Sequence, residues 1–328
     1  MELNDKNSNV ILLSILCITF NQEKYIRQTI ESFLMQKTDF VFEIILHDDA
    51  STDGTALIID EYSKFYPDII RPIYQTENKY SKQGLNFQFN HVFPHAKGKY
   101  VAFCEGDDYW IDPLKLQKQV SFLEENIDYG MVHTQAVQFS QKYNMFQETI
   151  GHDIVDFEGL LLENTVSNLT VLLRNNLLKK YIYEVNPQQK ISWSTVDYPI
   201  WLWVIQKAKI KFIDEPTGVY RILDSSICHH KNDEKRLFFQ QGIIDIVEYF
   251  YLINGFNYNK RILSKNYSRI ISNYFLNKKW LKIQKSIKVF YHSRDWLNLF
   301  WCLITIPFLK SYFLCKSSYF IKRKLTNS

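Results

Sequence analysis

The chain has 328 residues, a formal net charge of +4 and 46% hydrophobic residues, which is the composition of a globular protein with one large domain or two. Ten glycines leave little material for a glycine-rich phosphate loop. Residues 249–328 hold 15 lysines and arginines and one acid, Asp295, whereas the remainder has a balance of −10. A basic tail on an acidic body indicates an anionic partner surface. We expect a membrane and no nucleic acid, because no basic–aromatic motif of a nucleic-acid-binding module is present.

The cysteines and the first residues indicate a cellular compartment. The five cysteines are scattered and form no C-x-x-C pair, which is typical of reduced thiols in a cytosolic protein. Residues 1–9 are polar and lack the apolar core of a signal peptide. We therefore expect a cytoplasmic protein, peripheral on the inner face of the cytoplasmic membrane if the basic tail binds lipid.

In chain order, short apolar runs alternate with segments of helical period over the first 126 residues. The apolar runs predict strands at 10–18, 40–46, 69–74 and 100–104. The helical patterns predict helices at 23–36, 56–65, 86–95 and 114–126. Alternation of strand and helix favours an α/β layer with a largely parallel sheet.

The second half of the chain has weaker patterns. They predict strands at 130–139 and 166–173, a helix from 196 to about 207, and short edge strands at 211–213 and 218–221. From residue 232 on, aromatic and lysine-rich segments without strand punctuation predict helices. Composition and polarity therefore divide the chain into residues 10–231 and a helical, basic extension, residues 232–328.

Acidic clusters follow two of the predicted strands. His47-Asp48-Asp49 comes directly after the second strand, and Glu105-Gly106-Asp107-Asp108 directly after the strand at 100–104. Ligands of such sheets bind outside the carboxyl ends of the strands. Five carboxylates there repel one another unless a cation or hydrogen-bond donors stabilise them. Oxygen ligands suit Mg²⁺ or Mn²⁺, which in turn suits a phosphate-bearing substrate.

Four segments in this order resemble family 2 glycosyltransferases with a GT-A fold: 14–21 (SILCITFN), 33–36 (FLMQ), 43–55 (EIILHDDASTDGT) and 98–110 (GKYVAFCEGDDYW). The resemblance covers roughly residues 10 to 230. It implies a Rossmann-like, mixed and mostly parallel sheet flanked by helices. It also implies an inverting, metal-dependent enzyme that moves a sugar from a nucleotide diphosphate sugar to a saccharide or lipid-linked saccharide acceptor in bacterial cell-surface polysaccharide synthesis.

The resemblance assigns the nucleotide to the first two turns. It implies that Ile18, Thr19 and Phe20 line the base and ribose, and that Asp49 accepts a hydrogen bond from the base. Phe20 could instead belong to the core. The neighbouring Asp48 suits a turn-capping role as well as direct contact with the ligand.

The acidic turn after the strand at 100–104 is the metal candidate. The resemblance implies that Asp107 and Asp108 handle ribose and metal, with Glu105 as a further acid where the family usually has Asp. The expected ion is Mg²⁺ or Mn²⁺, which shares the charge of a diphosphate leaving group. The alternative is an exposed acidic turn that caps the next helix.

Asp197 is the candidate catalytic base. It precedes an apolar helix, and the resemblance places the general base at that position, where it takes the proton of the acceptor hydroxyl. An N-cap role is the alternative. Later in the chain, Leu223 stands where the family often has His, and Arg221 could reach a phosphate or pair with an acid of the fold.

The apolar stretch at 299–309 is too short for the ~20 residues of a membrane span, and lysines follow it. It fits a helix lying in the membrane interface or a helix packed on the core. Two other functions compete with sugar transfer. One is a sugar nucleotidyltransferase, and the other is a non-catalytic nucleotide-sugar-binding membrane scaffold.

Overall fold

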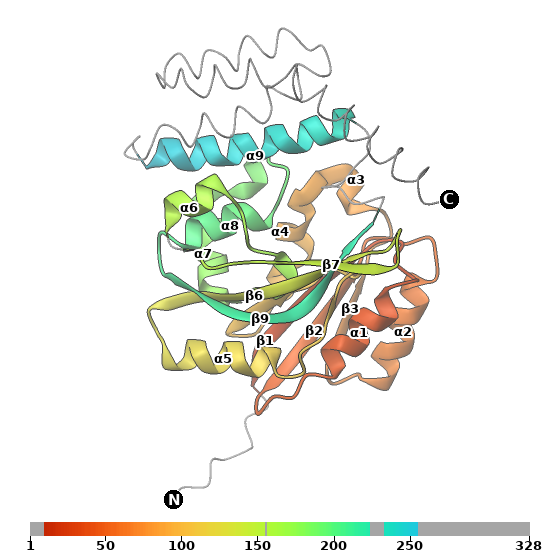
Figure 1. Ribbon diagram of the computed structural model, residues 1–328. Helices are drawn as coiled ribbons and strands as arrows, with labels where there is room; N and C mark the ends of the chain where they lie inside the picture. Colours follow the sequence, from red (N-terminus) through yellow and green to blue (C-terminus); the bar gives the residue numbers. More distant parts are fainter. Residues whose placement is uncertain (1–9, 155, 224–232, 255–328) are drawn as a thin grey trace, which may run out of the picture. The chain divides into compact units, whose positions relative to one another are not determined.

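The computed structural model describes residues 10–154, 156–223 and 233–254 (Figure 1). The chain divides into a first unit, residues 1–229, and a second unit, residues 230–328. In the second unit the described part is α9 (Asp233–Ile253), a helix with buried apolar side chains such as Val247 and Phe250. The remainder of the predicted helical extension, residues 255–328, lies outside the described residues.

The amino-terminal half of the sheet is parallel and has the order β3-β2-β1-β4. Its strands are β1 (Ile11–Thr19), β2 (Val41–Asp48), β3 (Ile70–Tyr74) and β4 (Tyr100–Phe103). All four are predicted by the apolar runs, and β1, β2 and β4, which are buried, read as continuous apolar stretches, whereas β3 is the partly exposed edge strand. Their order brings the ends of β2, β1 and β4 side by side at one edge.

The other half continues the sheet as β8-β6-β9-β5, with β7 paired to β6. It contains β5 (Tyr109–Trp110), β6 (Tyr129–Ser140), β7 (Met145–Ile150), β8 (Leu172–Arg174) and β9 (Lys209–Ile222). The β6–β9 ladder is parallel and long, while β8 pairs antiparallel with both β4 and β6. The result is the mixed, mostly parallel sheet expected from the sequence.

Helices cover both faces of this sheet. Figure 1 shows α1, α2 and α5 on one side and α4, α6, α7 and α8 on the other. The helices of the first unit are α1 (Ile26–Leu34), α2 (Thr55–Phe65), α3 (Lys79–Gln83), α4 (Phe87–His91), α5 (Lys115–Glu125), α6 (Phe157–Leu162), α7 (Asn175–Val185) and α8 (Asp197–Val204). No helix in the described part of the chain combines the length and apolar character needed to cross a bilayer.

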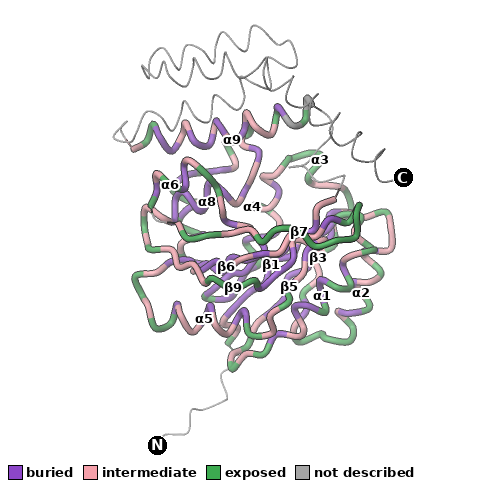
Figure 2. Tube along the Cα trace, viewed as in Figure 1, coloured by how far each residue is buried: buried purple, intermediate pink, exposed green. Residues whose placement is uncertain are grey.

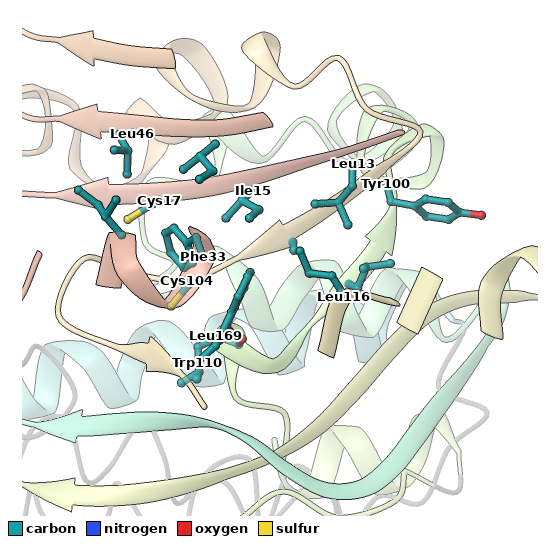
Figure 3. Close-up of a cluster of buried hydrophobic side chains, with 14 of the residues drawn as sticks. Leu13, Ile15, Cys17, Phe33, Leu46, Tyr100, Cys104, Trp110, Leu116 and Leu169 are labelled. Atoms are coloured by element: carbon teal, nitrogen blue, oxygen red, sulfur yellow. Dashed lines mark hydrogen bonds between the residues drawn. The ribbon is translucent and has the colours of Figure 1, made fainter. Parts of the chain in front are cut away.

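The core lies between the sheet and its helices. Alternate side chains of β1, Ile15 and Cys17, point to the face that α1 covers, where Phe33 packs on Trp110 with ring centroids 4.7 Å apart (Figure 3). The Trp110 indole donates to the Leu169 carbonyl at 2.8 Å. Figure 2 shows the central strands buried and β7 exposed. This packing fixes the strand ends that carry the acidic clusters.

Three strand predictions are wrong in extent. The two short edge strands predicted at 211–213 and 218–221 are one strand, β9, and it lies inside the sheet between β6 and β5. Its register against β6 shifts opposite Pro216, so the polar residues there form an irregularity and not a turn. The strand predicted at 166–173 is short, because residues Asn168–Thr170 form a 3-10 helix before β8.

Candidate functional site

The two acidic clusters flank the end of β1. Thr19 pairs with Asp48 across the β1–β2 ladder, and the Asp49 amide donates to the Thr19 carbonyl at 3.0 Å. On the other side, the Gly106 amide donates to the Ile18 carbonyl at 3.0 Å. The carboxyl ends of three neighbouring parallel strands therefore meet at one edge, which is where α/β sheets bind ligands.

Asp48 holds the turn after β2. It is 2% exposed, and its carboxylate accepts from the Ser51 hydroxyl at 2.5 Å and from the Ser51 amide at 3.1 Å. The Ser51 hydroxyl in turn accepts from the amide of Asn21, a residue with positive φ. Of the two roles that the sequence left open for Asp48, its contacts are those of a turn-capping residue.

Asp49 binds backbone amides. Its two carboxylate oxygens accept from the amides of Lys79 at 2.7 Å and Tyr80 at 2.9 Å. Each carboxylate oxygen has two lone pairs, so further acceptance is compatible with these bonds. Phe20 is 45% exposed, which excludes the core alternative for its ring. Thr19 is buried and Ile18 is half-buried.

The acidic turn after β4 packs closely against β1 and α1. The Thr29 hydroxyl donates to the carbonyl of Gly106 at 2.9 Å and to that of Asp108 at 2.6 Å. A Cβ at position 106 would come within 2.5 Å of Thr19 Cγ2 and overlap the Gln22 side chain. Glycine at position 106 therefore permits the approach that brings the acids to the end of β1.

The carboxyl groups of this turn are buried beside one another, which disfavours their ionised forms and raises their pKa values. Burial raises the pKa of Glu105 to about 7, and the charges of Asp107 and Asp197 add to the rise, while a hydrogen bond from Asn168 opposes it. Burial also raises the pKa of Asp107 and, with the neighbouring acids, raises that of Asp108 well above its usual range. A bound cation would relieve this repulsion.

These acids do not form a closed metal cage. No group of three or more histidines, cysteines or acids in the described residues could hold a metal ion. Glu105 Oε1 accepts from the Asn168 amide at 2.6 Å, and Asp108 Oδ1 accepts from the Arg221 backbone amide at 2.7 Å. Mg²⁺ commonly takes one or two carboxylates and completes its shell with phosphates and water. The donor set therefore suits a divalent cation that arrives with a phosphate ligand.

Asp197 reaches the same cluster from the other half of the chain. It is the first residue of α8, whose N-cap position is Val196, and burial raises the pKa of its carboxyl group. Helix α8 packs against the end of β4, where the Trp201 and Phe103 rings lie with their centroids 5.9 Å apart, and the charge of Asp197 contributes to the raised pKa of Glu105. Helix α8 is anchored by the Tyr198 hydroxyl, which donates to the Leu160 carbonyl at 2.9 Å.

Two further residues contact the acidic turn, and the sequence pattern pointed to only one of them, Arg221. Asn168 donates to Glu105, and no motif marks it. The Arg221 guanidinium donates to the Asp107 carbonyl and to the Gln28 side chain, so its charge is engaged within the fold. The sequence left open whether Arg221 reaches a phosphate or pairs with an acid of the fold, and its contacts in the structure are to the acidic turn and to α1.

Comparison with known proteins gives the family. The model of glycosyl transferase family 2 matches residues 14–182. An uncharacterized protein of Mycobacterium tuberculosis is 33% identical over 70% of this chain, and the alignment spans 64% of that relative. The glucosyltransferase WfgD of Escherichia coli, named as acting from UDP-Glc on GlcNAc-diphosphoundecaprenol, is 27% identical over 68% of this chain and 82% of its own length.

Solved structures agree on the fold. The S. aureus protein TarS, crystallised with UDP-GlcNAc, superposes with a TM-score of 0.55 at 17% identity, over 81% of this chain and 73% of TarS. The mannosyltransferase PcManGT of Pyrobaculum calidifontis, with GDP-Man and Mn²⁺, gives a TM-score of 0.50 at 15% identity, over 92% and 87%. From its sequence match and its fold, this chain belongs to glycosyl transferase family 2 and has the GT-A architecture.

Proposed function

We propose that the protein is an inverting glycosyltransferase that moves a sugar from a nucleotide diphosphate sugar to an acceptor hydroxyl during surface polysaccharide synthesis. The observation that carries this proposal is the packing of the helix that begins at Asp197 against the end of β4. The Trp201 ring, one turn after Asp197 in α8, lies with its centroid 5.9 Å from that of Phe103, two residues before Glu105. This contact supports a candidate base and candidate phosphate-binding acids at one edge of the sheet.

The donor would bind along the ends of β1, β2 and β4. The exposed ring of Phe20 offers a face to the base, with Ile18, Thr19 and Asp49 beside it. Asp107 and Asp108 would hold the ribose and a divalent cation, Mg²⁺ or Mn²⁺, with Glu105 next to them. When bound, the cation shares the charge that develops on the diphosphate leaving group. TarS with UDP-GlcNAc and PcManGT with GDP-Man and Mn²⁺ support this class of donor.

Asp197 would act on the acceptor. Burial raises the pKa of its carboxyl group toward the operating range, which favours proton transfer to a carboxylate base. The acceptor oxygen loses its proton to Asp197 and bonds to the anomeric carbon as the bond to the diphosphate breaks. One displacement inverts that carbon. The name of WfgD, which acts on a lipid-linked diphosphate sugar, supports a lipid-linked saccharide as acceptor.

The substitution Asp197→Asn tests the base. It keeps the size of the side chain and removes its basicity, so turnover should fall by about 10²–10⁴-fold while donor binding stays within twofold or so. Calorimetric titration measures binding, and release of nucleoside diphosphate measures turnover. Asp60→Asn, the same change in an exposed ion pair of α2, is the matched control and should behave as wild type. Unchanged turnover in Asp197→Asn would remove this residue from the role.

The same assays separate the two competing functions. A sugar nucleotidyltransferase would release pyrophosphate when it forms the nucleotide sugar, and would not transfer the sugar to an acceptor. A non-catalytic scaffold would bind the nucleotide sugar and turn over nothing, so Asp197→Asn would have no activity to reduce.

We further propose that the basic, apolar segment 296–328 holds the enzyme at the cytoplasmic membrane face. This segment lies outside the described residues, and its lysines beside an apolar stretch support the proposal. Flotation with anionic vesicles should recover the full chain and fail to recover a chain ending at residue 295. Equal recovery of the two chains would contradict the proposal.

A further inference from the structure

Arg221 connects β9, the acidic turn after β4 and helix α1 by hydrogen bonds. It lies near the end of β9 and is 5% exposed. Its backbone amide donates to Asp108 Oδ1 at 2.7 Å. Its guanidinium donates to the carbonyl of Asp107 and to the side-chain oxygen of Gln28 on α1. One residue of β9 thus contacts both acids of the turn and the helix packed beside them.

Two tyrosine rings hold the guanidinium in place. Its central carbon lies 5.1 Å from the ring centroid of Tyr25 and 4.5 Å from that of Tyr109. A guanidinium over an aromatic face at this distance gains cation–π attraction, and more so when water is excluded. The rings therefore fix the plane of the group whose N–H donors reach Asp107 and Gln28.

This arrangement argues against Arg221 as a phosphate ligand. A side chain with 5% exposure and donors directed at a backbone carbonyl and a glutamine presents little charge to an incoming anion. The guanidinium binds the backbone carbonyl of Asp107, so the carboxylate of Asp107 is not occupied by this bond. Arg221 can therefore affect a bound ligand only by fixing the position of the acidic turn.

We propose that Arg221 is a positioning residue: it sets the Asp107–Asp108 turn against β1 and α1, so that the two carboxylates are held where a cation-bridged nucleoside diphosphate binds. This inference rests on the proposed function. Lysine cannot replace arginine here, because a single ammonium cannot lie flat between two rings and donate to two separated acceptors.

The experiment compares Arg221→Ala and Arg221→Lys with a matched arginine elsewhere. Arg174 is partly buried, donates to the carbonyls of Tyr129 at 2.7 Å and Leu123 at 2.5 Å, and lies over a tyrosine ring at 5.6 Å. Its acceptors belong to α5 and β6 and not to the acidic turn, so Arg174→Lys and Arg174→Ala serve as controls for general loss of stability.

Calorimetric titration with UDP and with GDP, each in the presence of Mn²⁺, is the readout, together with urea unfolding of every variant. We expect both Arg221 variants to weaken binding of the nucleotide that wild type binds by at least about tenfold, which is 1.4 kcal/mol. The Arg174 variants should lose stability and keep wild-type affinity. Added guanidinium chloride at millimolar concentration should restore binding to Arg221→Ala by filling the space between Tyr25 and Tyr109, and should leave the Arg174 variants unchanged.

The outcomes are distinguishable. If wild type binds the nucleotide and Arg221→Ala or Arg221→Lys binds it equally well, the positioning role is wrong and the proposed function stands. If Arg221→Ala loses binding only in proportion to its stability, as Arg174→Ala does, and guanidinium restores nothing, the role is merely structural and the inference is overturned. If wild type binds neither nucleotide with Mn²⁺, the proposed donor site is refuted and the inference with it.

Discussion

The buried imidazole of His133 makes stability depend on pH. His133 lies on β6, is 0% exposed, and packs its ring 5.0 Å from that of Phe212. Neither ring nitrogen has a hydrogen-bond partner in the described part of the chain. Burial lowers the pKa of His133 from 6.5 to about 4, with a smaller contribution from His152. The unfolded chain therefore takes up a proton below pH 6.5, whereas the folded protein resists it until about pH 4.

The magnitude follows from proton linkage. A folded-state pKa below the unfolded value gives stability that is complete above pH 6.5 and lost as the pH falls toward 4. With a shift from 6.5 to about 4, the free energy of unfolding falls by about 1.8 kcal/mol between pH 7 and pH 5 from this one group. His133→Leu removes the group, and the neighbouring apolar ring accepts a leucine without leaving a polar atom unpaired.

Urea unfolding followed by tryptophan fluorescence at pH 7 and pH 5 measures the effect. The wild-type drop in unfolding free energy should exceed that of His133→Leu by about 1.8 kcal/mol. Val132→Ala, at the buried neighbouring position, should lose stability equally at both pH values and keep the wild-type pH dependence. An unchanged pH dependence in His133→Leu would refute the reasoning from burial.

Two further predictions concern the packing behind the site. Gly106→Ala would displace the acidic turn from Thr19 and Gln22. We expect the free energy of unfolding in urea to fall by about 1–3 kcal/mol and nucleotide binding, measured by calorimetry, to weaken. Wild-type values for both would contradict the close approach. Lys115 is fully buried, donates to Gln119 at 2.8 Å, and has its pKa lowered by burial from 10.5 to about 7. The free energy of unfolding that depends on a neutral Lys115 is therefore complete above pH 10.5 and is lost as the pH falls toward 7. Urea unfolding should show that the free energy of unfolding rises less from pH 7 to pH 10 in Lys115→Met than in wild type. An equal rise in the two proteins would argue against an unfavourable buried ammonium.

The parallel half of the sheet could be predicted because its signals are local. Each of β1, β2 and β4 is a continuous apolar run that ends in polar residues, and parallel order follows from the intervening helices. The same local signals predict that the two acidic clusters lie at one edge of the sheet, because each cluster directly follows a strand. By contrast, the sequence pattern divides β9 into two pieces, because the register shift opposite Pro216 that keeps it one strand depends on its pairing with β6.

The partners of the site residues could not be predicted, because they depend on long-range packing. Asp48 and Asp49 are adjacent acids, yet one caps its own turn and the other binds amides 30 and 31 positions away. The bond between Arg221 and Asp108 spans 113 positions, and that between Asn168 and Glu105 spans 63. Such pairings arise only when β9 pairs with β5 and the segment before β8 lies against the turn that follows β4.

The central claim is that the acidic turn after β4 binds a cation-bridged nucleoside diphosphate, and titration of Asp107→Asn tests it most directly. We expect wild type to bind UDP or GDP far more tightly with Mn²⁺ than with EDTA. Asp107→Asn should lose at least about tenfold in affinity and most of the Mn²⁺ dependence. Asp60→Asn, on the surface of α2, should match wild type. Equal, Mn²⁺-dependent binding by wild type and Asp107→Asn would contradict the account.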